Sequence, residues 1–367
     1  MQAMIWFIIT LLLLLAFERF YLRGPRPADY PVPAEPGAVS SFGSTAHEQP
    51  DFKAVTRQVE SLSGEIAAHL RRHNFAAARE LMDRLGEDRR YSSRFHRTEA
   101  DGVAAEWVLA PGADPLRRAL YIHGGGFVMG STRSHRTITS KFSDVCGCAV
   151  LAIDYRLLPE NRFTDAVTDC RNAYRWMLEN GPAGAGEAQR AFVAGDSAGG
   201  TLALSLSAWL RDRGLRLPDA VVAMSPLTDS TFSGASICEN LATDVMLAPA
   251  LRPLVRLPPF LRSLSIVWAY RVRPANPIAS PLFDDLSGLP PTLVQASEAE
   301  MLLDDARRYV YKARAAGTPA RLQTWAGMFH VFQIFERELP QARDAWTKIS
   351  QFIKQQAAEA PAQRERG

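Results

Sequence analysis

From about residue 103 onward, short apolar runs alternate with stretches whose apolar residues recur at helical spacing. The runs predict strands at residues 104–109, 119–123, 149–155, 191–194, 219–224, 291–296 and 321–325. The helical spacing predicts helices at about residues 134–146, 165–180, 201–210, 304–316 and 340–355, followed by a polar tail from Gln356. Strands that alternate with helices are typical of an α/β fold with a mostly parallel central sheet between helical layers.

Two segments depart from this alternation. Residues 51 to about 90 indicate two helices, the second at about 75–85, and both are rich in arginine. Those arginines fit a solvent-exposed helix face or a face that lies against anionic lipid. Residues 226–285 are rich in Pro and Ser and are predicted to be an insertion, not a strand–helix unit.

The N-terminus carries an apolar run at residues 4–17, which is short for a membrane span of about 20 residues. No basic residue precedes the run, no signal-peptidase site follows it, and Arg19, Arg23 and Arg26 come after it. We therefore expect residues 1–23 to be an uncleaved membrane anchor, with the following α/β domain in the cytoplasm. A cleaved signal peptide, or an anchor of opposite orientation, remains the alternative. The Pro-rich residues 24–50 predict an extended linker to the α/β domain at 51–367.

Composition narrows the functional class. The chain has 367 residues, a hydrophobic content of 47% and a net charge of only +3, which is not typical of a nucleic-acid-binding protein. The four cysteines, at 146, 148, 170 and 238, have no zinc-ligand spacing and are expected to be buried thiols.

Two glycine-rich motifs carry the candidate chemistry. Gly195-Asp196-Ser197-Ala198-Gly199 lies between a predicted strand and a predicted helix, which is the context of a nucleophile elbow. Upstream, His123-Gly124-Gly125-Gly126-Phe127 follows another strand. Consecutive glycines leave backbone N–H groups free to bind an oxyanion, so together the motifs predict acyl transfer by Ser197.

A serine nucleophile needs a base, and the base needs an orienting acid. His330 is the only histidine after the motif, and it follows the predicted strand 321–325. The acid is expected in the loop after strand 291–296, where Glu298, Glu300, Asp304 and Asp305 compete. The two aspartates suit the first turn of the next helix, which leaves the two glutamates in the loop.

These motifs resemble those of the hormone-sensitive-lipase-type esterase family, within the α/β-hydrolases. The resemblance rests on HGGGF, GDSAGG, the residues Asp154 to Glu160 and the sequence Ser280-Pro281-Leu282, and it covers roughly residues 55–355. It implies that Glu300 is the triad acid, as a glutamate in place of the usual aspartate, with Asp304 as the alternative. It also implies oxyanion donors at Gly124, Gly125 and Ala198, and a helical cap formed by residues 51–95 and 226–275.

We therefore expect a serine carboxylic-ester hydrolase that acts on hydrophobic esters of short to medium acyl length through Ser197, His330 and Glu300. No metal or organic cofactor is expected. His123 and Asp196 are expected to support their loops, and Asp154 to fix a nearby loop. The alternatives are an amidase or deacetylase on the same fold, and a non-catalytic ligand receptor, which the complete triad disfavours. The natural substrate and the oligomeric state are not readable from these residues.

Overall fold

The computed structural model describes residues 2–22, 30–43, 50–87 and 89–359. Within them, one nine-stranded sheet has the order β1-β11-β10-β9-β8-β4-β5-β3-β2. Its strands are β1 (Val39–Phe42), β2 (Arg94–Ala100), β3 (Val103–Leu109), β4 (Asp114–Ile122), β5 (Cys148–Ile153), β8 (Arg190–Asp196), β9 (Ala220–Met224), β10 (Thr292–Ser297) and β11 (Ala320–Trp325). Within this sheet, the β2–β3 and β3–β5 pairs are antiparallel and the other pairs are parallel. The predicted α/β fold with a mostly parallel sheet is confirmed.

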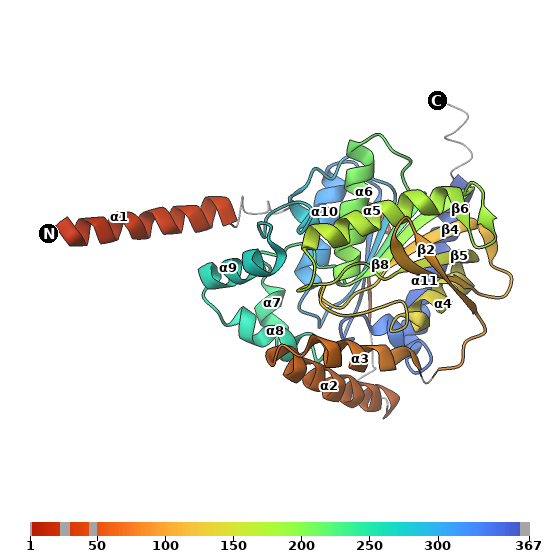
Figure 1. The fold of residues 1–367 in the computed structure, drawn as a ribbon, viewed down its shortest axis with the longest axis horizontal. Helices are drawn as coiled ribbons and strands as arrows, with labels where there is room; N and C mark the ends of the chain where they lie inside the picture. Colours follow the sequence, from red (N-terminus) through yellow and green to blue (C-terminus); the bar gives the residue numbers. More distant parts are fainter. Residues whose placement is uncertain (1, 23–29, 44–49, 88, 360–367) are drawn as a thin grey trace.

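Helices cover both faces of the sheet (Figure 1). One face packs against α5 (Phe163–Glu179), α6 (Ala198–Asp212) and α10 (Leu303–Ala315). The other packs against α4 (Arg136–Cys146) and α11 (Pro340–Glu359). Because both faces are covered, every residue of the central strands β5, β9 and β10 is buried, which explains their continuous apolar runs.

Four helices outside these layers lie together at one side of the molecule. They are α2 (Pro50–Arg71), α3 (Phe75–Glu87), α8 (Ala248–Val255) and α9 (Pro259–Tyr270), and we call them the cap helices. Helix α2 packs against α3 and α8, although about 180 residues separate α2 from α8 in the chain (Figure 1). The 226–285 insertion contains α8, α9 and the short elements α7 (Ser236–Glu239) and η3 (Pro281–Phe283), and no strand.

Three short elements were not predicted. β1 lies within the expected linker, yet it pairs in parallel with β11 at the sheet edge. β2 was missed because its sequence, Arg-Phe-His-Arg-Thr-Glu-Ala, is mostly polar, as suits an edge strand with exposed side chains. β6 (Asn180–Gly181) and β7 (Gly184–Ala185) form a separate hairpin in which each strand has two residues.

The N-terminal apolar run forms helix α1 (Gln2–Ala16), which is followed by a π-helical turn, η1 (Phe17–Leu22). At about 1.5 Å per residue, 15 residues reach about 22 Å, which is less than the roughly 30 Å of a bilayer core. Among the described residues no helix combines the length and apolarity that a membrane span needs. The prediction of a transmembrane anchor over residues 1–23 is therefore not supported.

Two smaller predictions need correction. Cys146, Cys148 and Cys170 are buried, but Cys238 is exposed. The arginines on α2 and α3 do not all serve an exposed face. Arg79 donates to the Val128 and Leu158 carbonyls and pairs with Glu160, so it holds α3 to the loops after β4 and β5. The end of the polar tail, residues 360–367, lies outside the described part of the chain.

Candidate active site

Ser197 occupies a sharp turn between β8 and α6. Its φ of 50° and ψ of −120° are unusual for a residue with a side chain, and such strain is typical of a nucleophile elbow. The turn also needs a glycine at 199, because a Cβ there would collide with the Ile122 carbonyl of the neighbouring strand. The predicted strand–turn–helix context is therefore present around Ser197.

His330 lies in the loop after β11, and its Nε2 is 2.9 Å from the Ser197 Oγ. The imidazole is buried, with 2% of its surface exposed. The next residue, Val331, has a φ of 50°, which turns the chain sharply after the histidine. This geometry suits proton transfer between the hydroxyl and the ring.

Glu300 lies on the other side of the imidazole. Its Oε2 is 3.6 Å from the His330 Nδ1, an ion-pair separation that is longer than a hydrogen bond. The same oxygen accepts a 2.7 Å hydrogen bond from the Ser225 hydroxyl. Burial disfavours the imidazolium, but Glu300, Asp244 and Asp196 together stabilise it more strongly, so the pKa of His330 is raised above its ordinary value.

The three competing carboxylates point elsewhere. Asp304 accepts a hydrogen bond from the Ser236 N–H, and Asp305 accepts from the N–H groups of Thr228 and Asp229. Glu298 accepts from the hydroxyls of Ser41 and Thr324. Of the four carboxylates considered from the sequence, Glu300 is therefore the one that the fold brings to His330.

Two residues near the triad were missed. Ser225 has a φ of 49°, donates to Glu300 and accepts a hydrogen bond from the Val331 N–H, so it ties the acid loop to the histidine loop. Asp244 is fully buried and accepts hydrogen bonds from the N–H groups of Met301 and Leu247. Its negative charge also contributes to the raised pKa of His330. Neither residue lies in a recognisable motif, so the sequence offered no signal for them.

The expected oxyanion donors divide into two groups. Gly125 and Ala198 line the cavity that holds Ser197, together with Gly126. The Gly124 N–H instead donates to the Asp196 Oδ1 at 3.2 Å. In this structure Gly124 is therefore engaged by Asp196, which contradicts the expectation that its N–H faces the oxyanion.

A buried polar cluster supports the glycine loop. The Asp196 carboxylate also accepts a 2.5 Å hydrogen bond from Tyr121 and lies 3.4 Å from the His135 imidazole. Burial favours protonation of Asp196, but His135, Tyr121 and His123 together outweigh this effect, so the pKa of Asp196 is lowered. His123 stacks on Tyr155, and burial lowers the pKa of His123 to about 3, so it is neutral at pH 7.

Asp154 has the supporting position that was expected. It accepts hydrogen bonds from the N–H and the hydroxyl of Thr132, at 2.6 and 3.1 Å, and so fixes the loop before α4.

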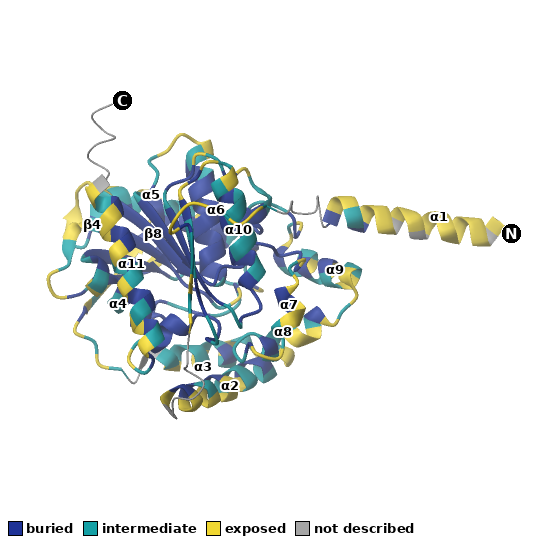
Figure 2. Cartoon of the chain, turned by 180° about the vertical axis from the view of Figure 1, so that it is seen from behind, coloured by how far each residue is buried: buried dark blue, intermediate teal, exposed yellow. Residues whose placement is uncertain are grey.

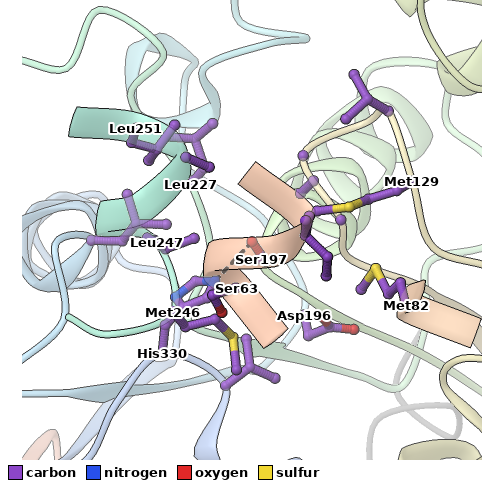
Figure 3. A pocket seen from close by; sticks show the side chains of 18 of the residues that line it. Ser63, Met82, Met129, Asp196, Ser197, Leu227, Met246, Leu247, Leu251 and His330 are labelled. Atoms are coloured by element: carbon purple, nitrogen blue, oxygen red, sulfur yellow. Dashed lines mark hydrogen bonds between the residues drawn. The ribbon is translucent and has the colours of Figure 1, made fainter. Parts of the chain in front are cut away.

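A cavity of about 300 Å³ opens beside Ser197, between the loops that follow the sheet strands and the cap helices. Figure 3 shows Ser197 and His330 together, with Met82, Leu247 and Leu251 of the cap helices and their flanks around them. The cap side of the lining is mostly apolar, with Gln58 and Ser63 of α2 as polar exceptions. Its apolar residues include Val59, Leu62, Ile66, Leu70, Met82, Leu85, Leu251, Leu254, Ile266 and Tyr270. Such a site suits an apolar ligand with a small polar centre.

The described residues contain no group of three or more His, Cys, Asp or Glu side chains that could hold a metal ion.

Comparison with known proteins identifies the family. Residues 119–334 match the model of a family described by its alpha/beta hydrolase fold. An acetyl-hydrolase from Streptomyces hygroscopicus is 40% identical over 251 residues, which are 68% of this chain and 79% of the relative. The carboxylesterase/phospholipase LipF of Mycobacterium tuberculosis is 36% identical over 262 residues, which are 70% of this chain and 68% of the relative.

A solved structure supports the same family assignment as these relatives. The crystal structure of an esterase from the bacterial hormone-sensitive lipase family superposes with a TM-score of 0.69 at 37% identity. The match covers 84% of this chain and 99% of that one. The chain thus belongs to the hormone-sensitive-lipase-type esterase family of the α/β-hydrolases, and it is a carboxylic-ester hydrolase.

Proposed function

We propose that this enzyme hydrolyses hydrophobic esters of short to medium acyl length, with Ser197 as nucleophile, His330 as base and Glu300 as the acid that orients it. The observation that carries the proposal is the 2.9 Å contact between the Ser197 Oγ and the His330 Nε2 inside an apolar cavity.

The reaction begins when the Ser197 Oγ attacks the ester carbonyl carbon and His330 Nε2 takes the hydroxyl proton. Glu300 stabilises the imidazolium from the Nδ1 side, where it lies 3.6 Å away. The imidazolium then gives its proton to the leaving alkoxide, the C–O bond breaks, and an acyl-serine remains. Water attacks the acyl-serine in the same way, and the acid and free Ser197 are released.

The negative charge of the tetrahedral intermediate needs preorganised donors, each of which typically contributes about 3 kcal/mol. We assign this role to the N–H groups of Gly125 and Ala198, with Gly126 in the place first expected for Gly124. All three residues line the cavity beside Ser197, and Ala198 begins helix α6. A helix N-terminus favours a developing oxyanion through its unpaired N–H groups and its dipole.

The substrate range follows from the lining. A cavity of about 300 Å³ whose cap side is apolar except for Gln58 and Ser63 favours an apolar acyl or alcohol chain. The name of the Streptomyces relative, an acetyl-hydrolase, supports activity on small acyl groups.

The test is hydrolysis of p-nitrophenyl esters from acetate to palmitate by the wild type and by Ser197→Ala. We expect the wild type to prefer short and medium acyl chains and the variant to lose activity on the order of 10⁶-fold. Retained activity in Ser197→Ala would exclude Ser197 as nucleophile. Faster hydrolysis of an anilide than of the ester with the same acyl group would favour the amidase alternative.

A further inference from the structure

Exposed large apolar side chains are concentrated in one region of the molecule. Among the described residues, the exposed large apolar side chains lie on α1, η1 or α9, with the exceptions of Val32, Leu116 and Leu215. On α1 almost every described side chain is exposed, and the helix extends outward from the same side of the molecule as α9 (Figures 1 and 2). Contiguous exposed apolar surface of this kind marks an interaction site.

Helix α9 is apolar on two faces. Ile266 and Tyr270 are buried and line the active-site cavity. Leu261, Leu264 and Trp268 recur at helical spacing on the opposite face, and Trp268 is 75% exposed. A helix that is apolar all round normally has an apolar environment on both sides, which α9 has on one side only.

The two exposed surfaces are joined. η1 contacts α9, its Leu22 is buried, and the Arg273 guanidinium lies 4.9 Å from the centre of the Tyr21 ring. A shallow groove between α8 and α9 continues the surface, with Leu257, Leu261 and Trp268 in its lining. Leu254 and Ile266 line both this groove and the active-site cavity. The surface therefore adjoins the site where the substrate reacts.

The charge of this segment identifies its partner. Residues 245–283 contain no Asp or Glu and carry five arginines, at 252, 256, 262, 271 and 273. Four of these are exposed: Arg252 in α8, Arg256 at the end of α8, Arg271 at the end of α9, and Arg273 just beyond it. A second copy of the chain would bring like charges together on this surface, which is unfavourable. An anionic lipid surface instead offers phosphate groups to arginine and an apolar layer to Leu and Trp.

We propose that the face of α9 with Leu261, Leu264 and Trp268, together with α1 and η1, docks on the surface of a membrane that contains anionic phospholipid. In this arrangement α9 lies in the interface and does not cross the membrane. Esters dissolved in the lipid then have a short path past Leu254 and Ile266 to Ser197. This binding surface goes beyond the proposed hydrolysis, because it does not depend on the triad.

The test reports on position 268 itself, because α1 alone could bring the full chain to vesicles. Trp268→Cys is made in a Cys238→Ser background, and the thiol is labelled with an environment-sensitive fluorophore. The matched control is Leu215→Cys, an exposed leucine in the segment that follows α6, whereas Ser197 precedes the first residue of that helix. With vesicles of phosphatidylcholine and phosphatidylglycerol, we expect a blue shift of the label at position 268 that high salt reverses, and no shift at position 215.

A second variant measures binding strength and separates it from catalysis. The triple change Leu261→Ser, Leu264→Ser and Trp268→Ser is expected to lower the vesicle partition coefficient of the full chain about tenfold or more. Hydrolysis of soluble p-nitrophenyl butyrate stays within about twofold of wild type, because none of the three side chains lines the cavity.

Three results would overturn the proposal. One is a label at position 268 that responds no more than the label at position 215 when the protein is bound to vesicles. Another is an equal response to purely neutral vesicles, since the arginines would then play no part. The third is a lipid-free dimer that the triple change dissociates, which would make the surface a contact between copies of the chain.

Discussion

Ser197, His330 and Glu300 follow three parallel strands of the sheet, β8, β11 and β10, with β9 lying between β10 and β8, and each is held by contacts outside its own motif. The strained backbone of Ser197 presents its hydroxyl to the cavity. Ser225 reaches both Glu300 and the backbone of Val331, so one hydroxyl fixes the acid and histidine loops relative to each other. At the scale of single residues, the proposed chemistry depends on these supporting contacts as well as on the triad.

Removal of the Glu300 charge is expected to move the pH profile. Only neutral His330 accepts a proton, so kcat/KM rises with pH through the pKa of His330, and Glu300 raises that pKa. Glu300→Gln should therefore shift the acid limb to lower pH and reduce kcat on the order of 10⁴-fold. The matched control is Asp304→Asn, whose carboxylate faces Ser236 and whose acid limb should not move. The reverse pattern would make Asp304 the triad acid.

Loss of the Ser225 hydroxyl should weaken catalysis without weakening binding. Ser225→Ala removes a hydrogen bond to a buried carboxylate, so kcat is expected to fall about 10- to 100-fold with KM little changed. Ser207→Ala is the control, because Ser207 is a buried serine that bonds only the Ala203 carbonyl of its own helix. Equal effects of the two variants in steady-state kinetics would mean that Ser225 has no special role.

At the scale of elements, the cavity is shaped by helices from two distant parts of the chain. α2 and α3 precede the sheet, and α8 and α9 lie in the insertion after β9. These helices supply the apolar side chains above Ser197, whereas the strand ends supply the polar groups. Such a division leaves the reaction unchanged when the cap varies, so selectivity for the acyl chain is expected to reside in the cap.

Leu251 of α8 offers a test of that division. Leu251→Trp fills part of the cavity and should lower activity on hexanoate relative to acetate at least about tenfold. Arg252→Gln, one residue along the same helix on its exposed side, should leave the ratio unchanged. Competition between the two p-nitrophenyl esters gives the ratio directly. An unchanged ratio for Leu251→Trp would show that the acyl chain lies elsewhere.

At the scale of the whole molecule, segments far apart in sequence complete the sheet and the site. β1 reaches the sheet edge beside β11, where the ring centres of Phe42 and Trp325 lie 4.9 Å apart and the Lys348 Nζ lies 4.1 Å from the centre of the Phe42 ring. This contact ties the N-terminal segment to the catalytic domain next to the histidine loop. The segment that forms β1 is thus a structural part of the domain and not only a connection to α1.

Phe42→Ala tests whether the contact between Phe42 and Trp325 stabilises the protein. Loss of a half-buried aromatic pair should lower the free energy of unfolding by about 1–2 kcal/mol, measured by urea denaturation. Val32→Ala is the control from the same segment, since Val32 is 63% exposed, and it should change the free energy by less than about 0.5 kcal/mol. If both variants match wild type, the pairing of β1 with β11 adds nothing to stability.

The amino-acid sequence was sufficient to predict the fold class and the family, and it identified Ser197 as the candidate nucleophile. Apolar runs mark buried parallel strands because both faces of such strands are covered, and the two glycine motifs mark turns whose backbone geometry restricts the residue type. His330 was also identifiable as the candidate base, because it is the only histidine that follows the Gly195–Gly199 motif in the sequence.

Only the tertiary structure decided which groups meet. It brought Glu300 to His330 and directed Asp304 to α7, it engaged the Gly124 N–H with Asp196, and it placed Ser225 and Asp244 beside the triad. It also showed that helix α1 is only 15 residues long and that the supposed linker contains a strand. Local patterns report the burial and backbone geometry of one segment. Contacts between loops depend instead on distances in space, which no local pattern contains.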